Sequence, residues 1–341
     1  MRNRNLPTIS ILIPTLNAAR FLKFCLGEIR KQDYPKEKIE VIIADGGSTD
    51  QTLMIAHQYK AKVYSNPLKT GEAGKAVALR HARGELIALI DSDNILPDKN
   101  WFRRMVEPFS DPEVIGSEPW EFTYRKKDGF IDRYCALMGM NDPLCYFLGN
   151  YDRLNVLSGS WTGLNIDQED RGGWLKVILK HEVLPTIGAN GTLIRREIFK
   201  KNELVKDYLV DIDILAKLTI KKPVAFAKVK IGIIHLYCGS DILKFIRKQK
   251  RRIKDYLYYQ QKGVRHYPWQ KHQRRGLVKF ILSCFLIFPL IYQILKGYFK
   301  KPDSAWLFHF LACWLTFLIY TGGVIEGVFR RQEMSRQKWR Q

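Results

Sequence analysis

The chain has 341 residues, with 56 Lys and Arg against 34 Asp and Glu, which gives a formal net charge of +22. Residues 241–341 hold 21 of the basic residues against 5 acidic ones, and they also contain the two longest apolar runs. The sequence shows no zinc-finger spacing, CxxC pair or aromatic RNA-binding motif, so the charge favours lipid headgroups over nucleic acid, and the six cysteines indicate neither a zinc site nor a disulfide framework.

Short apolar runs rich in β-branched residues alternate with helical patterns through the first 90 residues. Ile9–Ile13 and Val41–Ala44 are typical of buried parallel strands, and Ala18–Lys31 between them has the apolar spacing of a helix. A predicted helix, strand, helix and strand follow at Thr49–Tyr59, Ala61–Ser65, Gly74–Ala82 and Leu86–Ile90. This alternation predicts an α/β fold with a doubly wound, mostly parallel sheet of the Rossmann-like kind.

The loops that follow these strands contain most of the polar candidates for a site. In a doubly wound sheet the ligand lies beyond the carboxyl ends of the strands, where such loops converge. We therefore expect Pro14–Asn17, Asp45–Ser48 and Asp91–Asn94 to surround one crevice.

Regular patterns weaken between Gly116 and Ile187, where Trp, Tyr, Gly and Asp are frequent. We interpret this stretch as the acceptor side of the site. Regularity returns with a helical pattern over Asp211–Leu218 and with short strands at Val224–Lys230 and Ile231–His235.

The motif Asp91-Ser92-Asp93 follows the fourth predicted strand directly. Alternate carboxylates at a strand end can hold a divalent cation that also binds a diphosphate, and Mg²⁺ and Mn²⁺ prefer such oxygen ligands. Asp is also common in solvated turns, so the motif by itself leaves a purely structural role open.

The chain contains three segments that resemble family 2 glycosyltransferases in their order and spacing, namely ISILIPTLNAARFLKFCL, EVIIADGGSTDQT and TGEAGKAVALRHARGELIALIDSDN. The resemblance is strong over residues 9–110 and weaker over 185–240. It implies a GT-A fold. We therefore expect a catalytic domain over 1–239, with a nucleotide-sugar half at 1–115 and an acceptor half at 116–239.

The resemblance also assigns residues to the nucleotide-sugar. Those that would line the nucleotide pocket are Pro14, Thr15 and Asn17. Asp45 looks like the carboxylate that contacts the nucleotide base. Its alternative role is to form the turn before Gly46. Many family members have a second aspartate at the position of Gly46. Lys75 falls where the family has an arginine near the diphosphate. The single charge of an ammonium would then replace the two parallel hydrogen bonds that a guanidinium can donate. The alternative interpretation is that Lys75 is an ordinary solvated lysine on a helix.

A divalent metal, Mn²⁺ or Mg²⁺, follows from the same resemblance. Asp91 is similar to the residue that contacts the ribose or the metal, and Asp93 is similar to the direct metal ligand. Ser92, between them, is expected to contact the nucleotide-sugar. His235 resembles a late histidine that some GT-A enzymes add to the metal shell, although a lone histidine at a strand end is often structural.

An inverting transfer needs one group to take the proton of the acceptor hydroxyl. The run Val210-Asp211-Ile212-Asp213 resembles the family's Glu-Asp motif, with Val210 in the place of the glutamate. Asp211 therefore aligns with the catalytic base, and Asp213 is the alternative base. Asp is also a favoured helix N-cap, a role that Asp211 could combine with catalysis.

The C-terminal third indicates a membrane attachment. Within a basic segment over 240–275, Lys244–Lys254 has seven basic residues in eleven positions, typical of a helix on anionic headgroups or of an ordinary basic surface helix. Residues 276–341 would form two membrane helices, Leu277–Leu295 and Trp306–Ile325, and a basic tail, with both ends in the cytoplasm. A pair of half-inserted helices fits almost as well.

Together these features predict a membrane-attached glycosyltransferase whose catalytic domain lies in the cytoplasm. It would move one sugar, by inversion, from a metal-bound nucleotide-sugar to a lipid-linked or membrane-proximal glycan acceptor. The resemblance favours UDP as the nucleotide and leaves GDP open, and the QxxRW signature of processive synthases is missing. The closest alternative is a polyprenyl-phosphate glycosyltransferase, and the alternative of another class is an inactive membrane scaffold.

Overall fold

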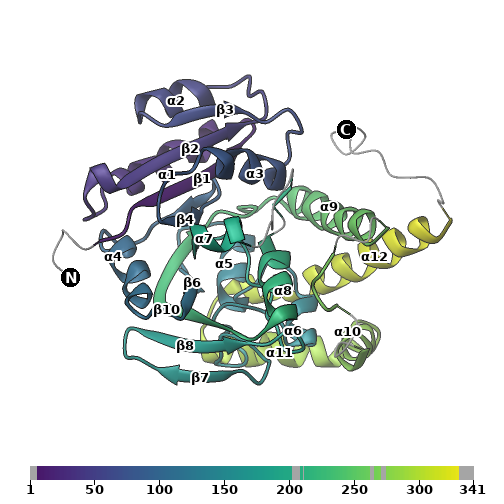
Figure 1. Ribbon diagram of the computed structural model, residues 1–341. Coiled ribbons are helices and arrows are strands. Elements are labelled where there is room, and N and C mark those ends of the chain that lie inside the picture. The colour runs from purple at the N-terminus through teal and green to yellow at the C-terminus, as the bar shows by residue number, and fades with distance from the viewer. Residues whose placement is uncertain (1–5, 202–207, 210, 262–264, 270–273, 330–341) are drawn as a thin grey trace. The chain divides into compact units, whose positions relative to one another are not determined.

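The computed structural model describes residues 6–201, 208–209, 211–261, 265–269 and 274–329 (Figure 1). Its elements pack into two units. The first, called the sheet unit, comprises the chain up to Thr123 together with Leu164–His235. The second, called the helical unit, comprises Tyr124–Gly163 and the chain from Leu236. Residues 124–163 therefore interrupt the sequence of the sheet unit, whereas the sequence analysis places one continuous domain over 1–239.

The sheet unit is built on ten strands. Their bounds are β1 Ile9–Thr15, β2 Ile39–Asp45, β3 Lys62–Ser65, β4 Leu86–Leu89, β5 Asn94–Ile95, β6 Val114–Phe122, β7 Asp167–Asp170, β8 Trp174–Leu179, β9 Thr192–Arg195 and β10 Val224–His235. They pair in the order β3-β2-β1-β4-β9-β6-β10-β8-β7, with β5 on β10. The strands from β3 to β4 are parallel, as are β6 and β10, and β9, β8, β7 and β5 pair antiparallel to their neighbours. The predicted α/β class is confirmed.

The helices of the sheet unit follow the strands. Their bounds are α1 Ala19–Arg30, α2 Thr52–Gln58, α3 Gly71–His81, α4 Trp101–Val106, α7 Arg196–Lys201 and α8 Asp211–Lys221. Helix α3 packs against β1 and β2. Gly74 permits this close approach, because a Cβ atom there would lie 2.8 Å from the Cβ of Pro14.

The middle of strand β1 is apolar on both faces. Ile11, Leu12 and Ile13 are consecutive residues of β1 and are all fully buried, as expected for a strand in the middle of an α/β sheet. Strand β10 runs without a break from Val224 to His235, so the stretch predicted to supply one or two short strands forms a single one. Its register against β6 shifts between Val229 and Gly232, which is where the apolar pattern is interrupted.

The helical unit contains α5 Phe130–Met138, α6 Leu144–Leu148, α9 Ile242–Gln261, α10 Arg274–Leu286, α11 Phe288–Lys300 and α12 Phe308–Phe329. The stretch Leu277–Leu295, predicted as one membrane helix, is divided between α10 and α11, which meet at an angle of 95° and together are apolar enough for one broken span or a re-entrant loop. Ile287 adopts a left-handed conformation, with φ of 62°, between them. Pro289 stands in the first turn of α11, where its missing N–H costs nothing, so the proline begins a new helix.

The second predicted membrane helix does form a long helix. Ser304–Gly327, which joins a short 3₁₀ turn to most of α12, is long and apolar enough to cross a bilayer, and 28% of its most apolar window is buried. Length and composition alone do not show that it does so, since core helices of soluble proteins share both properties.

A buried ion pair links two central strands of the sheet unit. Lys228 of β10 and Glu118 of β6 are register partners, both side chains are fully buried, and the Lys228 ammonium donates a hydrogen bond to the Glu118 carboxylate. Lys228 also donates to the carbonyl oxygen of Pro119 at 3.1 Å. Each charge is satisfied only while the other is present.

We expect Lys228→Met to lower the free energy of unfolding by about 3–5 kcal/mol, because it removes the cation that neutralises a buried carboxylate. The matched control is Lys230→Met, since Lys230 pairs with Asp170 at the surface and such pairs contribute at most about 1 kcal/mol. Urea unfolding of the two variants measures the difference, and equal effects would contradict the assignment.

Candidate functional site

Asp45 organises the loop that follows β2. It lies opposite Thr15 in the parallel β1–β2 ladder, and its Oδ1 accepts hydrogen bonds from the hydroxyls of Thr15 at 2.8 Å and Ser48 at 2.6 Å. Its Oδ2 accepts from the backbone N–H groups of Gly47 at 2.9 Å and Ser48 at 2.8 Å. Burial favours the protonated acid, but these hydrogen bonds outweigh burial and lower the pKa of Asp45.

These four hydrogen bonds use the acceptor positions that a carboxylate has, which number about four. A contact between Asp45 and a nucleotide base therefore requires that the base replace one of the present donors. The structural role that the sequence left open for Asp45 is observed, and the contact with the base stays a prediction.

Asn17 connects the loop after β1 to the loop after β2. Its backbone N–H donates to the Ser48 hydroxyl at 2.8 Å, and its side-chain oxygen accepts from the N–H of Thr49 at 2.9 Å. Asn17 has a φ of 50°, in the left-handed region that asparagine tolerates better than most residues. The structure thus brings two of the three predicted loops together.

Lys75 lies at the centre of the candidate site. It is on α3, its side chain is only 5% exposed, and its Nζ is 2.9 Å from Oδ2 of Asp211 and 3.3 Å from Oδ1 of Asp91. Burial alone would lower the pKa of Lys75, but Asp211, Asp91 and Glu72 together raise it, so the ammonium stays charged. The alternative of a solvated helix lysine is therefore wrong.

Asp211 is the first residue of α8 and is 19% exposed. Its Oδ2 accepts the hydrogen bond from Lys75, whereas its Oδ1 is buried and has no hydrogen-bond partner among the described residues. Burial raises the pKa of Asp211 to about 6; the Lys75 ammonium opposes this rise and the Asp91 carboxylate adds to it. The alternative base, Asp213, is buried in the same first turn of α8, and Val210 lies outside the described residues.

The Asp91-Ser92-Asp93 turn is held by Asn94, the residue directly after it. The Asn94 side-chain oxygen accepts from the N–H of Asp91 at 3.0 Å, and its amide donates to the side chain of Asn190 at 3.0 Å. Asn94 is fully buried. Asn94 belongs to the loop Asp91–Asn94 that the sequence places at the crevice, but no role of its own was predicted for it; its position directly after the two aspartates is the available signal.

His235 reaches this turn through strand pairing. As the last residue of β10 it pairs with Asn94 of β5, and this register places its Nε2 3.7 Å from Oδ1 of Asp93. The side chains of Asp93 and His235 are 20% and 7% exposed. The structure therefore brings together two candidate metal ligands that are far apart in sequence, Asp93 and His235, while Ser92 stays half-buried in the turn itself.

The donor set suits a hard divalent cation. Two carboxylates, on Asp91 and Asp93, and one imidazole, on His235, lie around one turn. In the part of the chain that the structure describes, no group of three or more His, Cys, Asp or Glu side chains is arranged to hold a metal ion. The metal therefore stays a prediction; Mg²⁺ or Mn²⁺ would take one or two carboxylates and complete its shell with substrate phosphates and water.

The comparison with known sequences agrees with this geometry. Residues 10–157 match glycosyl transferase family 2. The chain carries a family 2 glycosyltransferase domain. The match includes the loops of Asn17 and Asp45, the helix of Lys75 and the Asp91–Asp93 turn, and it ends before Asp211 and His235.

Curated relatives of the chain match over shorter stretches. The Staphylococcus aureus poly(ribitol-phosphate) beta-N-acetylglucosaminyltransferase TarS is 37% identical over 93 residues, which are 26% of this chain and 16% of that protein. The Haloferax volcanii glycosyltransferase AglE is 31% identical over 144 residues, 40% of this chain and 46% of that protein. Each match thus spans less than half of the relative's own length.

A solved structure confirms the GT-A fold. The Pyrobaculum calidifontis mannosyltransferase PcManGT, in complex with GDP-Man and Mn²⁺, superposes with a TM-score of 0.54 over 97% of this chain and 89% of that one. Its sequence identity is 14%, so the likeness concerns the fold alone.

We expect Asp45→Ala to release the loop over Gly47 and Ser48. Hydrogen bonds to a charged acceptor contribute about 1.5–3 kcal/mol, so amide hydrogen exchange at these two residues should quicken by roughly ten- to a hundredfold. The control is Asp50→Ala, which removes a carboxylate that accepts from Thr52 and Ala19 instead. Unchanged exchange at Gly47 and Ser48 in Asp45→Ala would contradict this account of the loop.

Proposed function

We propose that the chain transfers a sugar from a nucleotide-sugar to an acceptor hydroxyl, with inversion and with a divalent metal at the donor. The observation that carries this proposal is the buried Lys75, which bridges the first aspartate of the metal motif and the candidate base. This contact supports donor chemistry on one side of the ammonium group and proton acceptance on the other.

Asp211 is the residue that we assign as general base. A base works best when its pKa is near the working pH, and burial raises the pKa of Asp211 to about 6. The unpartnered Oδ1 is the oxygen that can take a proton, since Oδ2 is held by Lys75. The hydrogen bond from Lys75 also fixes the orientation of the carboxylate before the acceptor arrives.

Lys75 has a second task in this proposal. Its ammonium keeps the Asp211 and Asp91 carboxylates close together despite their like charges. It also supplies one positive charge beside the position of the diphosphate, a point charge that does not depend on the fork geometry of an arginine.

The metal would be held by Asp93 and His235, with Asp91 on the side of Lys75. When bound, the cation supplies electrostatic neutralisation of the charge that builds up on the leaving diphosphate. The donor set supports Mn²⁺ or Mg²⁺, and the structure of PcManGT with GDP-Man contains Mn²⁺.

In the reaction, Oδ1 of Asp211 accepts the proton of the acceptor hydroxyl as the acceptor oxygen bonds to the anomeric carbon. The bond from that carbon to the diphosphate oxygen breaks, and the nucleoside diphosphate leaves with the electron pair. A single displacement of this kind inverts the anomeric carbon.

The acceptor that we propose is lipid-linked or otherwise close to a membrane. Relatives carry names with poly(ribitol-phosphate) and with dolichyl N-acetyl-alpha-D-glucosaminyl phosphate, and the long apolar helix supports attachment to a membrane. We retain UDP as the expected nucleotide, with GDP as the alternative, and place the sheet unit in the cytoplasm. A polyprenyl phosphate as the direct acceptor is the second candidate.

We expect Asp211→Asn to lower kcat by about 10²–10⁴-fold, the usual contribution of a general base, without loss of nucleotide binding. The matched control is Asp213→Asn, which changes the other aspartate of the same helical turn and should keep most of the activity. The measurement is release of nucleoside diphosphate from a panel of nucleotide-sugars with Mn²⁺ and membrane lipids. The opposite ranking would make Asp213 the base, and silence of the wild type across the panel would favour the inactive scaffold.

The acid limb of the pH profile should report Asp211. Because the carboxylate must be ionised to accept a proton, kcat/KM should fall as the pH drops through about 6. Lys75 lowers this pKa, so Lys75→Met should move the limb to higher pH as well as reduce the maximal rate. The position of the limb is the readout, and a limb that stays in place would mean that Asp211 is not the titrating group.

A further inference from the structure

Helices α10 and α11 form a sharp elbow, which we define as residues 274–300. The two helices are equal in length and meet at 95° around Ile287. The N–H of Ile287 ends α10 by donating to the carbonyl of Ser283 at 3.1 Å, and the carbonyl of Ile287 accepts from Leu290 at 2.9 Å at the start of α11. The elbow is therefore a hydrogen-bonded corner rather than a bent single helix.

The tip of the elbow is apolar and exposed. Large apolar side chains that are between 41% and 73% exposed gather there, namely Leu282, Phe285, Leu286, Ile287, Phe288 and Ile291. The charged residues nearest to the tip are Lys279 on α10 and Lys296 on α11, and none lies between them. Each lysine is about 12–14 Å along its helix from Ile287, close to half of the ~30 Å hydrocarbon core of a bilayer.

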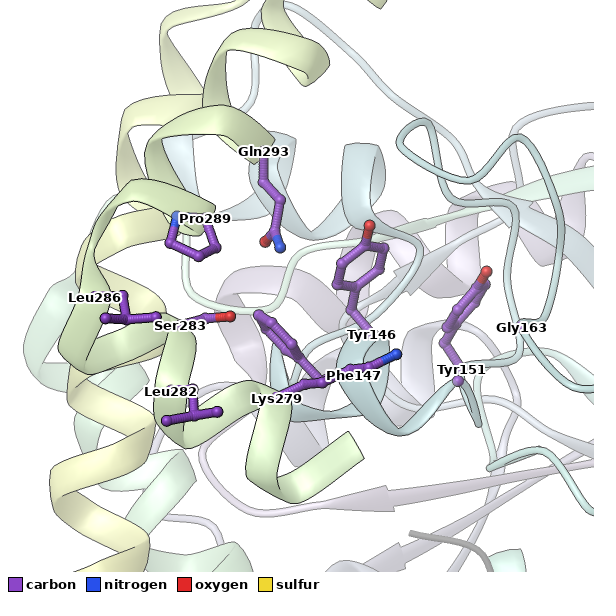
Figure 2. Close-up of a pocket in the computed structure, with 11 residues that line it drawn as sticks. Tyr146, Phe147, Tyr151, Gly163, Lys279, Leu282, Ser283, Leu286, Pro289 and Gln293 are labelled. Atoms are coloured by element: carbon purple, nitrogen blue, oxygen red, sulfur yellow. The ribbon is translucent and has the colours of Figure 1, made fainter. Parts of the chain in front are cut away.

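The inner angle of the elbow has a different character. A pocket of about 480 Å³ lies between it and α6, and Ser283 and Gln293 contribute polar groups to its lining (Figure 2). Tyr146 and Tyr151, whose rings stack with centroids 6.5 Å apart, form another part of the lining. Leu282, Leu286 and Pro289 of the elbow also line this pocket, whereas Phe285, Ile287, Phe288 and Ile291 are exposed and do not belong to its lining.

The chain returns from the elbow to the side from which it entered. Directly after α11, Asp303 accepts hydrogen bonds from the Tyr124 hydroxyl and from Nε of Arg133, the latter at 3.1 Å. Tyr124 and Arg133 belong to the first segment of the helical unit, so the connection between α11 and α12 is held against the residues with which the chain enters that unit. Two complete spans, the topology predicted from sequence, would require these entry residues to lie on the far side of the membrane together with Asp303.

Helix α12 packs against the basic helix α9. The rings of Phe245 and Phe308 lie 5.2 Å apart, the Tyr320 hydroxyl donates to Gln249 at 3.0 Å, and Gly323 packs closely on Ile253. Seven basic residues belong to α9, namely Lys244, Arg247, Lys248, Lys250, Arg251, Arg252 and Lys254. If α12 crossed the bilayer, these charges would have to enter the hydrocarbon with it, which is strongly unfavourable.

We propose that the helical unit is monotopic: the tip of the elbow enters the hydrocarbon of one leaflet, and neither the elbow nor α12 spans the bilayer. The partner is a leaflet with anionic headgroups, which complements the basic residues of α9 and the lysines on both arms of the elbow. Ser283 and Gln293 in the inner angle, and the hydrogen bonds of Asp303 with Tyr124 and Arg133, would keep both ends of the elbow on the protein side while its tip lies in lipid. This inference concerns topology and does not depend on the transferase activity.

Single cysteines in the full-length chain test the topology, because the six native cysteines are all buried. Reporters are Lys31→Cys on the sheet unit, Ser304→Cys after the elbow, Glu326→Cys near the end of α12 and Phe288→Cys at the tip. A membrane-impermeant maleimide is applied to sealed right-side-out and inside-out vesicles, with the wild type as blank. We expect the first three reporters to react from the same face, and Phe288→Cys to react only after detergent is added.

Each other pattern overturns the proposal in a distinct way. Reaction of Ser304→Cys from the face opposite to Lys31→Cys would show that the elbow spans. Reaction of Glu326→Cys alone from the opposite face would show that α12 spans. Ready reaction of Phe288→Cys in intact vesicles would show that the tip is not in lipid.

A matched pair of substitutions measures the contribution of the tip. Phe288 is 73% exposed at the elbow, and Phe24 is 60% exposed on α1 of the sheet unit. We expect Phe288→Lys to weaken flotation of the full-length protein with equimolar phosphatidylglycerol and phosphatidylethanolamine vesicles by about tenfold or more, the effect of withdrawing one buried phenyl group from lipid. Phe24→Lys should leave flotation unchanged, and equal behaviour of the two variants would contradict insertion of the tip.

Discussion

A charged ammonium group is stable inside a protein only when carboxylates surround it, and much of the sheet unit is arranged to satisfy Lys75 in this way. Its partners come from separate places, Asp91 from the turn after β4 and Asp211 from the start of α8. Gly74 lets α3 approach β1 closely enough for the lysine to reach both. The position of α3, the conformation of the metal motif and the start of α8 are therefore linked by one electrostatic requirement.

Local patterns in the sequence predicted the loops of the site and the class of the fold. Strand ends, the Asp91-Ser92-Asp93 motif and the residues around Asp45 are short-range signals, because the chemistry and the backbone geometry that they need lie within a few residues. The pairing of Lys75 with Asp211 joins residues 136 positions apart. No local pattern contains that information, and the same holds for the register that places His235 beside Asn94.

The C-terminal region shows a second limit of the sequence. Apolar composition over a window of about twenty residues predicted a continuous helix across Pro289, but composition does not include the direction of the chain. A single residue with left-handed backbone, Ile287, turns one apparent span into two short helices. The return of the chain is recorded only in the contacts of Asp303, whose partners Tyr124 and Arg133 lie far away in the sequence.

The interleaving of the two units has a consequence for how the protein can be divided. One apolar core of the helical unit combines Ile131, Tyr134 and Leu137 of α5 with Phe245 of α9 and Trp306 at the start of the last helix. Helix α5 is encoded between two segments of the sheet unit, so the helical unit is not an appendage that follows a finished sheet unit. Removal of everything after β10 would leave α5 attached to the sheet unit with its core partners missing, so a single cut cannot separate the two units.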